Sequence, residues 1–224
     1  MDPVRHFDAQ YAEQAVLDDG TQVTLRLLRP TDKALLLAGF AHLSARSRYR
    51  RFLAQKARLS DRELRYLTEL DHEMHFALAA LTVDAQGREA GVGIARFVRQ
   101  PDRPEIAEPA VVVIDSMQGR GLGRLLCRRL AEAARERGVT SFRCEVLASN
   151  EPMRALIDQL SPHAHIEQNG GSATIEFTLT APGPAAATTE AAVGSMVDYL
   201  LRLASRGAMV VLHRALARWT NHPA

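Results

Sequence analysis

Residues 118–123 (QGRGLG) form a glycine-rich stretch that follows an apolar run and leads into a periodic, amphipathic segment. Glycines at such a junction let the backbone turn sharply and let a ligand approach main-chain N–H groups. Those N–H groups and the positive end of a helix dipole favour anions, and Arg120 and Arg124 can pair with phosphate oxygens. The stretch therefore predicts a phosphate-binding loop.

The spacing within this loop excludes two common phosphate sites. A dinucleotide fingerprint needs glycine at position 126, where Leu126 stands, and a Walker loop needs a lysine that is absent here. The pattern of acyl-CoA N-acyltransferases, Gln/Arg-x-x-Gly-x-Gly/Ala, matches at Gln118, Gly121 and Gly123. A helix entry with spare glycines is the alternative interpretation.

The surroundings of the loop resemble the GNAT superfamily in order along the chain. Residues 107–117 (AEPAVVVIDSM) resemble its fourth strand, and the helix 121–137, the strand ending at 146–149 and then Asn150 continue the likeness. The resemblance covers about Val16 to Thr180. A narrower likeness to the acetyltransferase domain of bacterial protein lysine acetyltransferases (Pat) rests on residues 29–32, 43–44, 47–52, 59–60, 71, 75 and 77–78.

The resemblance implies that acetyl-CoA is the cosubstrate. Main-chain N–H groups around Val112 to Ile114 are expected to hold the thioester oxygen, and this strand to pair with pantetheine like an added strand. Asn150 is expected to hydrogen-bond the pantetheine amide, or to cap the helix that follows it. The expected cofactor-binding residues are Val112, Val113, Ile114, Gln118, Gly119, Arg120, Gly121, Leu122, Gly123, Arg124 and Asn150.

Transfer to an amine requires a proton acceptor, because an alkylamine has a pKa of about 10.4 and attacks a thioester only when neutral. The resemblance implies that Glu108, in the Ala-Glu step of the central strand, is this catalytic base. Pro109 has no N–H, which predicts a bulge that aims Glu108 into a cleft. The alternative is a solvated carboxylate paired with an arginine. Asp71, His75 and Asp115 are rival bases, or turn and capping groups.

Other positions on the substrate side carry less information. The superfamily often places a tyrosine acid seven residues after the asparagine, but Ile157 stands there, so no protein acid is assigned. The leaving thiolate, with an intrinsic pKa of about 8.5, can depart unprotonated. Tyr49 and Arg51 lie where the family places substrate-side helices; a solvated basic helix face is the other interpretation.

Apolar periodicity and turn residues predict the elements that must hold these groups. The expected strands are 15–17, 21–28, 74–83, 90–98, 106–114, 142–147, 165–168 and 173–180. The expected helices begin at Thr31 or Asp32 and run to 43, and cover 47–54, 61–70, 121–137 and 151–160, with Ser44 and Ser60 as caps. This order predicts an α/β fold of the GNAT type, a mixed central β-sheet flanked by helices, plus a C-terminal helical extension.

Composition shifts predict four segments. Residues 1–20 form an N-terminal extension with the first hairpin strand, 21–180 the acetyltransferase domain, 181–190 a linker and 191–219 an amphipathic helix. Arginines interrupt the faces of that last helix, so it can pack on its own domain, form a homodimer seam, or lie on a lipid surface. Packing against its own or a twin domain is favoured.

The composition limits the classes of partner. A formal net charge of +2 gives no strong field towards nucleic acid or anionic lipid. No signal peptide or membrane-spanning run is present, and Cys127 and Cys144 have neither disulfide nor metal-ligand spacing, which predicts a cytoplasmic protein without a metal.

These observations predict an acetyl-CoA-dependent N-acetyltransferase whose preferred acceptor is a protein lysine. The first rival is acetylation of a small amine, which needs the same base and the same cofactor loop. The second rival is a non-catalytic acyl-CoA-binding sensor, which would keep the loop but tolerate loss of Glu108.

Overall fold

The computed structural model describes residues 5–45, 47–48, 57–84, 86–147, 164–170 and 172–179. Its strands are β1 (Ala12–Val16), β2 (Gln22–Leu27), β3 (His75–Val83), β4 (Glu89–Arg99), β5 (Ile106–Val113), β6 (Ser141–Leu147), β7 (Ala164–Asn169) and β8 (Ser172–Thr178). Its helices are α1 (Lys33–Ala41), α3 (Asp61–Thr68) and α4 (Leu122–Glu136). The expected helices 47–54, 151–160 and 191–219 lie wholly or largely outside the described residues.

The described strands form one mixed sheet, as predicted. Its order is β1-β2-β3-β4-β5-β6-β8-β7. Among these strands β5 and β6 pair in parallel, and every other neighbouring pair is antiparallel. The parallel step follows from the chain path, because α4 connects β5 to β6 and a helical crossover returns the chain in the same direction.

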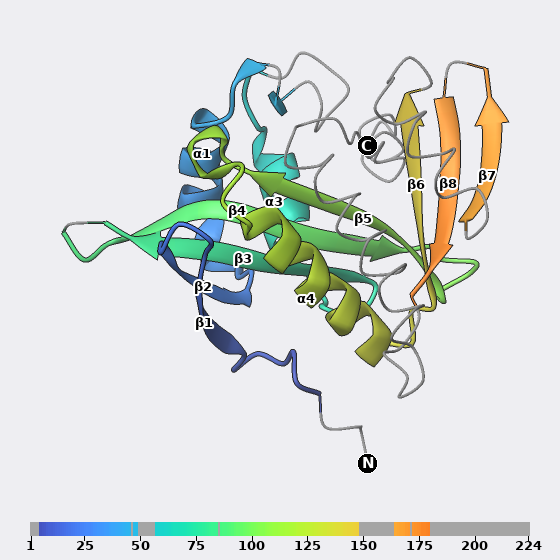
Figure 1. The fold of residues 1–224 in the computed structure, drawn as a ribbon, viewed down its shortest axis with the longest axis horizontal. Helices are drawn as coiled ribbons and strands as arrows, with labels where there is room; N and C mark the ends of the chain where they lie inside the picture. Colours follow the sequence, from blue (N-terminus) through green and yellow to red (C-terminus); the bar gives the residue numbers. More distant parts are fainter. Residues whose placement is uncertain are drawn as a thin grey trace.

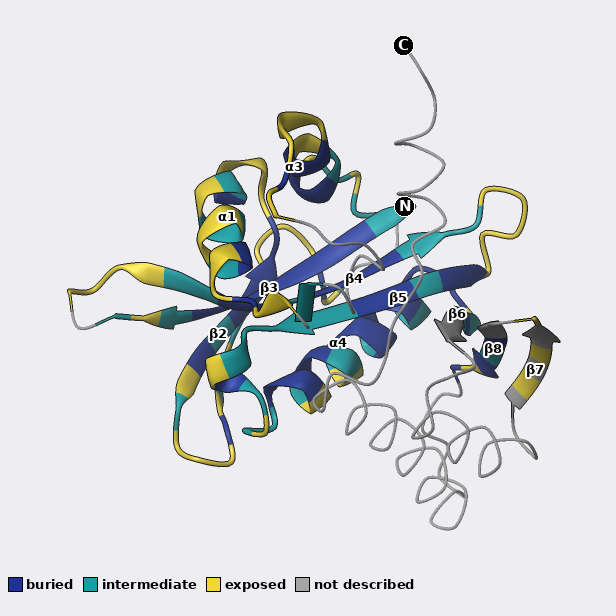
Figure 2. Ribbon diagram, turned by 90° about the horizontal axis from the view of Figure 1, so that it is seen from above, coloured by how far each residue is buried: buried dark blue, intermediate teal, exposed yellow. Residues whose placement is uncertain are grey.

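Helices cover the two faces of the sheet in separate layers. Figure 2 shows α1 and α3 on one face and α4 on the other. On the α4 side the core includes Leu122, Leu126, Leu130, Phe76 and Phe97. On the opposite side Phe40 and Leu43 pack with Leu59, Leu64 and Leu67. Figure 1 shows α4 lying across the sheet.

Local chemistry explains where several elements begin. Gly20 adopts a positive φ of 86° in the turn that joins β1 and β2, as the Asp-Gly signal predicts. β1 starts at Ala12, three residues before the expected strand, because an edge strand with alternate residues exposed has a weak apolar pattern. Ser60 caps α3 through a reciprocal pair of contacts with Glu63, which confirms the expected cap.

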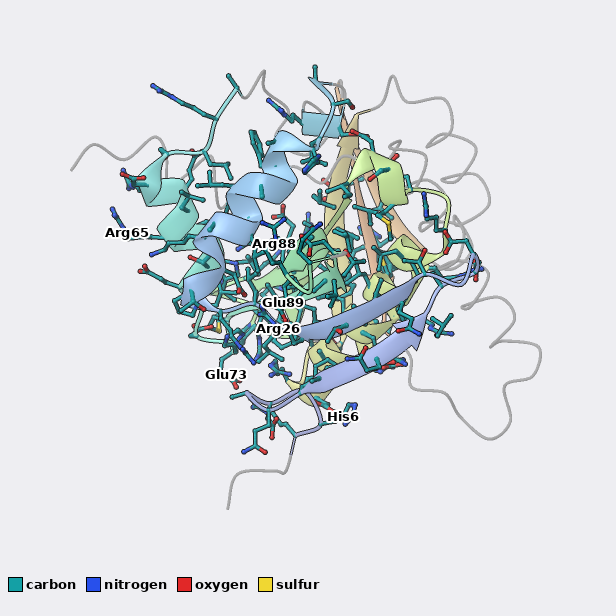
Figure 3. The ribbon with its side chains drawn as sticks, turned by 90° about the vertical axis from the view of Figure 1, so that its left-hand side faces the viewer. His6, Arg26, Arg65, Glu73, Arg88 and Glu89 are labelled. Carbon is teal, nitrogen blue, oxygen red and sulfur yellow. The ribbon has the colours of Figure 1, made fainter. Side chains whose placement is uncertain are left out.

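The start of α1 differs from the prediction. Asp32 stands at the N-cap position, but its side chain makes no cap hydrogen bond. The carboxylate instead accepts from Arg26 Nη1 at 2.7 Å and Nη2 at 2.9 Å, and from the Arg29 N–H at 2.8 Å. A buried arginine on β2 therefore takes the side chain that the sequence suggested as a helix cap. Figure 3 shows Arg26 beside Glu89, a second carboxylate at 3.3 Å.

The expectation of a bulge at Pro109 is wrong. The register between β4 and β5 runs without a shift through Phe97–Pro109 and Val98–Glu108. The irregularity lies instead between β3 and β4, at Ala80 and Leu81. Pro109 needs no bulge, because its nitrogen lies on the edge of β5 that faces away from β4, where no ladder bond is lost.

The core begins close to the N-terminal end of the described chain. Phe7, Tyr11 and Leu17 are buried in the same cluster as the α4 residues. Among the described residues, no helix has the length and apolarity needed to cross a membrane.

Candidate active site at the divergence of β5 and β6

Beyond its first two residues, β5 has an open edge. In the described part of both strands, β5 pairs with β6 at Ile106 and Ala107 only, whereas its pairing with β4 continues to Val113. Figure 1 shows β6 running steeply away from the layer of β3, β4 and β5. The backbone of β5 beyond Ala107 is therefore available for hydrogen bonding on this side.

Strand alternation identifies the main-chain groups that face the opening. The Ile114 N–H donates to Val92 O near the start of β4. In an antiparallel ladder the bonded positions alternate, so the even-numbered residues of β5 bond to β4 and the odd-numbered ones face the other edge. Pro109, Val111 and Val113 therefore present their main chain to the opening.

Ile114 and Gln118 have main-chain groups that are already bonded. Ile114 donates its N–H to Val92 O and accepts from Met117 N, and the Gln118 N–H donates to Asp115 O. Ile114, and by the same alternation Val112, therefore has no free N–H for a cofactor, contrary to the expectation for residues 112–114. Its side chain packs between the two core clusters.

The Gln118 side chain has a structural task. Its Nε2 donates to Val113 O at 3.1 Å and to Asp115 Oδ1 at 3.0 Å. One of the three outward carbonyls of β5, that of Val113, is thereby occupied. The carbonyls of Pro109 and Val111 and the N–H groups of Val111 and Val113 remain turned to the opening.

The glycine-rich loop joins the end of this edge to α4. Gly119 and Gly121 have positive φ angles of 78° and 88°, and Gly121 is the N-cap residue of α4. The first N–H groups of a helix have no intrahelical acceptor. Together with the helix dipole, they form an anion site beside the β5 edge.

Two acidic residues of the β1–β2 turn lie against this loop. Arg120 pairs with Asp19 at 2.7 Å and Arg124 with Asp18 at 2.8 Å. A Cβ added to Gly121 would meet Asp18 Oδ2 at 2.7 Å. Each of the two arginines is thus paired with a carboxylate in this structure, which the sequence prediction did not anticipate.

Glu108 lies on the face of the sheet that carries α1 and α3. The register aligns His75, Val98 and Glu108 across β3, β4 and β5, and residues opposite each other in a sheet share a face. Val112, four residues further along β5, packs against the cluster under α1 and α3. Glu108 itself is partly buried.

A buried arginine stands in the neighbouring row of the same face. Arg96 is 2% exposed and pairs in register with Ala77 and Ala110. Its Nη2 lies 3.4 Å from His75 Nδ1, and its guanidinium carbon lies 5.3 Å from the centre of the Tyr66 ring. Arg96, His75 and Tyr66 thus form a polar cluster on the face of the sheet that Glu108 shares.

The rival bases differ in what they already bind. Asp71 Oδ1 accepts from the N–H groups of Glu73 and His75, both at 2.9 Å, which makes it a turn group. Partial burial would raise the pKa of Asp115, but hydrogen bonds from Ser47, Ser44 and Gln118 together lower it. Asp115 is therefore a weaker base than an ordinary carboxylate. His75 stays a rival, because it lies in the same row as Glu108.

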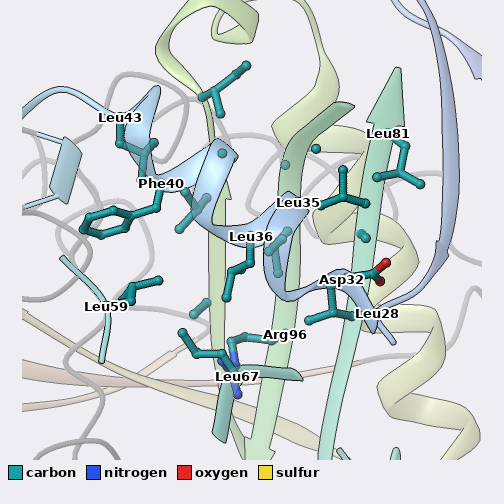
Figure 4. A pocket seen from close by; sticks show the side chains of 18 residues that line it. Leu28, Asp32, Leu35, Leu36, Phe40, Leu43, Leu59, Leu67, Leu81 and Arg96 are labelled. Atoms are coloured by element: carbon teal, nitrogen blue, oxygen red, sulfur yellow. The ribbon is translucent and has the colours of Figure 1, made fainter. Parts of the chain in front are cut away.

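A cavity of about 80 Å³ lies between α1 and the sheet. Figure 4 shows Leu35, Leu36 and Phe40 of α1 and Leu81 of β3 around it. Its described lining is apolar except for Asp32 and Arg96. It offers an apolar space next to the polar cluster, but it holds no candidate base.

Several expected site residues lie outside the described residues: Asn150, Tyr49, Arg51 and Ile157. Within the described ranges, no group of three or more His, Cys, Asp or Glu side chains could hold a metal ion. Sequence reasoning missed Asp18, Asp19 and Arg96. Of these three, Arg96 could have been found, because an arginine inside the apolar run of β4 is an unusual residue for a buried strand.

Comparison with known proteins places this geometry in a family. The profile of the acetyltransferase (GNAT) family matches residues 40–160. The chain is 38% identical over 137 residues to Acetyltransferase Pat of Mycolicibacterium smegmatis, covering 61% of this chain and 40% of that protein. It is 34% identical over 140 residues to Acetyltransferase PA5475 of Pseudomonas aeruginosa, covering 62% of this chain and 74% of that one.

A solved structure agrees with these matches. The crystal structure of the GNAT domain of S. lividans Pat matches with a TM-score of 0.64 and 28% sequence identity, covering 77% of this chain and 99% of that domain. The chain thus spans the whole of a Pat acetyltransferase domain but less than half of the mycobacterial Pat. With the diverging β5–β6 pair, the glycine loop and the family match in agreement, the chain belongs to the acetyltransferase (GNAT) family.

Proposed function

We propose that this chain transfers an acetyl group from acetyl-CoA to an amine, with a protein lysine as the preferred acceptor. The observation that carries the proposal is the open edge of β5 next to the N-terminus of α4. An extended amide-containing tail can pair with a free strand edge, and a pyrophosphate fits a helix N-terminus. Few ligands other than an acyl-CoA carry both groups at the two ends of one chain.

The residues present fit such a ligand. Gly119 and Gly121 bend the loop at positive φ, and no described atom lies within 4 Å of a Cβ added to Gly119. The open main chain of Val111 and Val113 supplies a carbonyl and an N–H for the pantetheine arm and the thioester oxygen. When bound, acetyl-CoA supplies an activated acetyl group.

Glu108 is proposed as the base that accepts the amine proton, directly or through a water. The amine nitrogen forms a bond to the thioester carbon, the carbon–sulfur bond breaks, and the electron pair leaves on the thiolate. The Val113 N–H stabilises the oxygen as its charge develops. Because Glu108 shares a face with α1 and α3, the amine is expected to approach from that side.

The cosubstrate assignment can be tested by thermal shift. Acetyl-CoA should raise the melting temperature of the wild type by mass action. Gly121→Glu should abolish the rise, because it adds a side chain and a negative charge to the anion site. Gly87→Glu is the matched control, since Gly87 also has a positive φ (76°) but lies in the β3–β4 turn. A full shift in Gly121→Glu would exclude the loop as the phosphate site.

The acceptor can be identified by mass spectrometry after incubation with acetyl-CoA. One sample contains a cell lysate or lysine-containing peptides, and a second contains polyamines and aminoglycosides. New acetyl-lysine marks would support the protein acceptor, and acetylated small amines alone would support the rival enzyme. Binding of acetyl-CoA without thiol release in either sample would favour the sensor.

A further inference from the structure

The Asp115 carboxylate joins two parts of the molecule that are distant in sequence. It lies just after β5, in the 3-10 turn Asp115–Met117. Its Oδ2 accepts from the Ser44 N–H at 2.5 Å, and its Oδ1 accepts from Ser47 Oγ at 2.6 Å. The same Oδ1 accepts from Gln118 Nε2 at 3.0 Å.

These contacts form a continuous path across the site. Ser47 Oγ donates to Asp115, Gln118 donates to Asp115, and Gln118 also donates to Val113 O at 3.1 Å. Val113 is one of the two residues, with Val111, whose N–H faces the open edge of β5. The path therefore runs from the segment after α1 to the peptide group proposed to meet the thioester.

The segment at Ser44 is itself anchored to the α1 and α3 layer. Ser47 N donates to Ser44 Oγ at 3.2 Å, and Arg48 Nε donates to Leu43 O at 3.0 Å. Leu43 is buried in the cluster that contains Phe40. This is the side of the sheet on which Glu108 lies, and from which the amine is expected to arrive.

The charge of Asp115 does not serve phosphate binding. A carboxylate in the loop that receives a pyrophosphate repels it, so an uncharged residue would suit that task better. A carboxylate does, however, accept from several donors and donates to none. Here it meets a main-chain N–H, a hydroxyl and an amide together. An asparagine would turn its NH2 group towards at least one of these donors.

We propose that Asp115 is a positioning residue that couples the cofactor side of the site to the acceptor side. It fixes the Gln118 amide under Val113 O, and it fixes Ser44 and Ser47 against the end of β5. A displacement of the segment that contains Ser44 and Ser47 is then transmitted to the main chain of Val113, and a displacement at Val113 is transmitted to that segment. The inference rests on the proposed function and adds a residue and a coupling to it.

A double-mutant cycle tests the coupling. Ser47 and Gln118 share Asp115 Oδ1, and no described hydrogen bond joins them to each other. Ser47→Ala, Gln118→Ala and the double variant are compared by kcat/KM for a lysine peptide and by Kd for acetyl-CoA. The combined effect should differ from the product of the single effects by about 3-fold or more, because contacts within one network are not additive.

The cycle is then repeated in an Asp115→Asn background. The two effects should become multiplicative to within about 2-fold, as for independent sites. Asp84→Asn is the matched control: its carboxylate also accepts two main-chain N–H groups and an arginine, but in the β3–β4 turn. It should leave the coupling unchanged, even where the melting temperature falls.

The possible outcomes separate the two proposals. Multiplicative effects in the wild-type background, or coupling that persists in Asp115→Asn, would overturn the positioning role while activity stands. The cycle on Ser47 and Gln118 still decides the matter if Asp115→Asn does not fold. A wild type that binds acetyl-CoA without turnover would contradict the proposed reaction, yet coupling in Kd would uphold the positioning role. A wild type that does not bind acetyl-CoA contradicts both.

Discussion

At the scale of single residues, Glu108 is distinguished by its neighbours. It shares a row with His75 and lies diagonally across from the buried Arg96, on the face opposite α4. Two other carboxylates that the sequence offered are already engaged: Asp71 accepts main-chain hydrogen bonds within its own turn, and Asp115 accepts hydrogen bonds from the distant Ser44 and Ser47. Position in the sheet, rather than residue type, therefore favours Glu108 over them.

Replacing Glu108 with glutamine should separate binding from turnover. The variant keeps the shape of the side chain and loses its basicity, so we expect acetyl-CoA binding to change little and turnover to fall by about 100-fold or more. The loss should shrink as the pH rises from 7 towards 10, because more of the amine is already neutral. Thiol release with a lysine peptide measures this. Equal rates for both proteins over the whole range would move the role to His75.

Asp18 should weaken the binding of acetyl-CoA. Its carboxylate pairs with Arg124 and lies against Gly121, so it repels a pyrophosphate at the same place. The pair is largely exposed, and an exposed charge contributes little. We therefore expect Asp18→Asn to lower the Kd by only about 3-fold at low salt, and the gain to fade as salt screens the charges. Asp102→Asn, in the exposed β4–β5 turn, is the control. An unchanged or higher Kd in Asp18→Asn would contradict the repulsion.

At the scale of elements, the sequence predicted the order well because apolar periodicity and turn residues report local structure. The glycine loop and α4 were found from spacing alone. The path through Asp115 was not, because it depends on contacts between residues about 70 positions apart. The prediction of a bulge at Pro109 was wrong for a similar reason, because it depends on the path of another strand. A missing N–H predicts a break only if that edge is paired, and the divergence of β6 leaves it unpaired.

The start of α1 depends on a buried ion pair. Arg26 and Asp32 are 6% and 4% exposed, and their bidentate contact joins β2 to the turn before the helix. Breaking such a pair leaves an uncompensated charge and costs about 3 kcal/mol. We expect Asp32→Asn to lower the free energy of unfolding by about 3 kcal/mol. Glu69→Gln, which breaks the exposed pair with Lys33, should cost under about 1 kcal/mol.

The same pair gives a pH dependence of known sign. Burial raises the pKa of Asp32, but the hydrogen bonds from Arg26 and Arg29 outweigh it, and the pKa in the folded state lies below the ordinary value. A group whose pKa is lowered on folding stabilises the protein above its unfolded pKa of about 3.9 and loses that effect as the pH falls. The free energies of unfolding of the wild type and of Asp32→Asn, measured in urea, should therefore approach each other as the pH falls below about 4. A constant difference down to pH 2 would contradict the assignment.

At the scale of the whole molecule, the N-terminal segment is part of the folded unit. Phe7 is 1% exposed. Arg137, at the end of α4, donates to Phe7 O at 2.7 Å and to His72 O at 2.6 Å. Its guanidinium also lies 4.2 Å from the centre of the Phe76 ring. Through Arg137, the segment at Phe7 is thus hydrogen-bonded to the C-terminal end of α4, the helix whose N-terminus forms the anion site.

Two truncations should therefore have opposite effects. Every group assigned to cofactor binding on the described residues lies before Thr180, so a chain of residues 1–180 should fold and keep the acetyl-CoA thermal shift. A chain that starts at residue 21 loses β1 and Phe7, which is one of the partners of Arg137, and exposes the edge of β2. We expect it to be insoluble or to melt at least about 10 °C lower, since several buried side chains are removed together. Circular dichroism and thermal shift measure both chains. If 1–180 is folded but does not bind acetyl-CoA, residues after 180 contribute to the site, and the boundary of the catalytic unit must be moved.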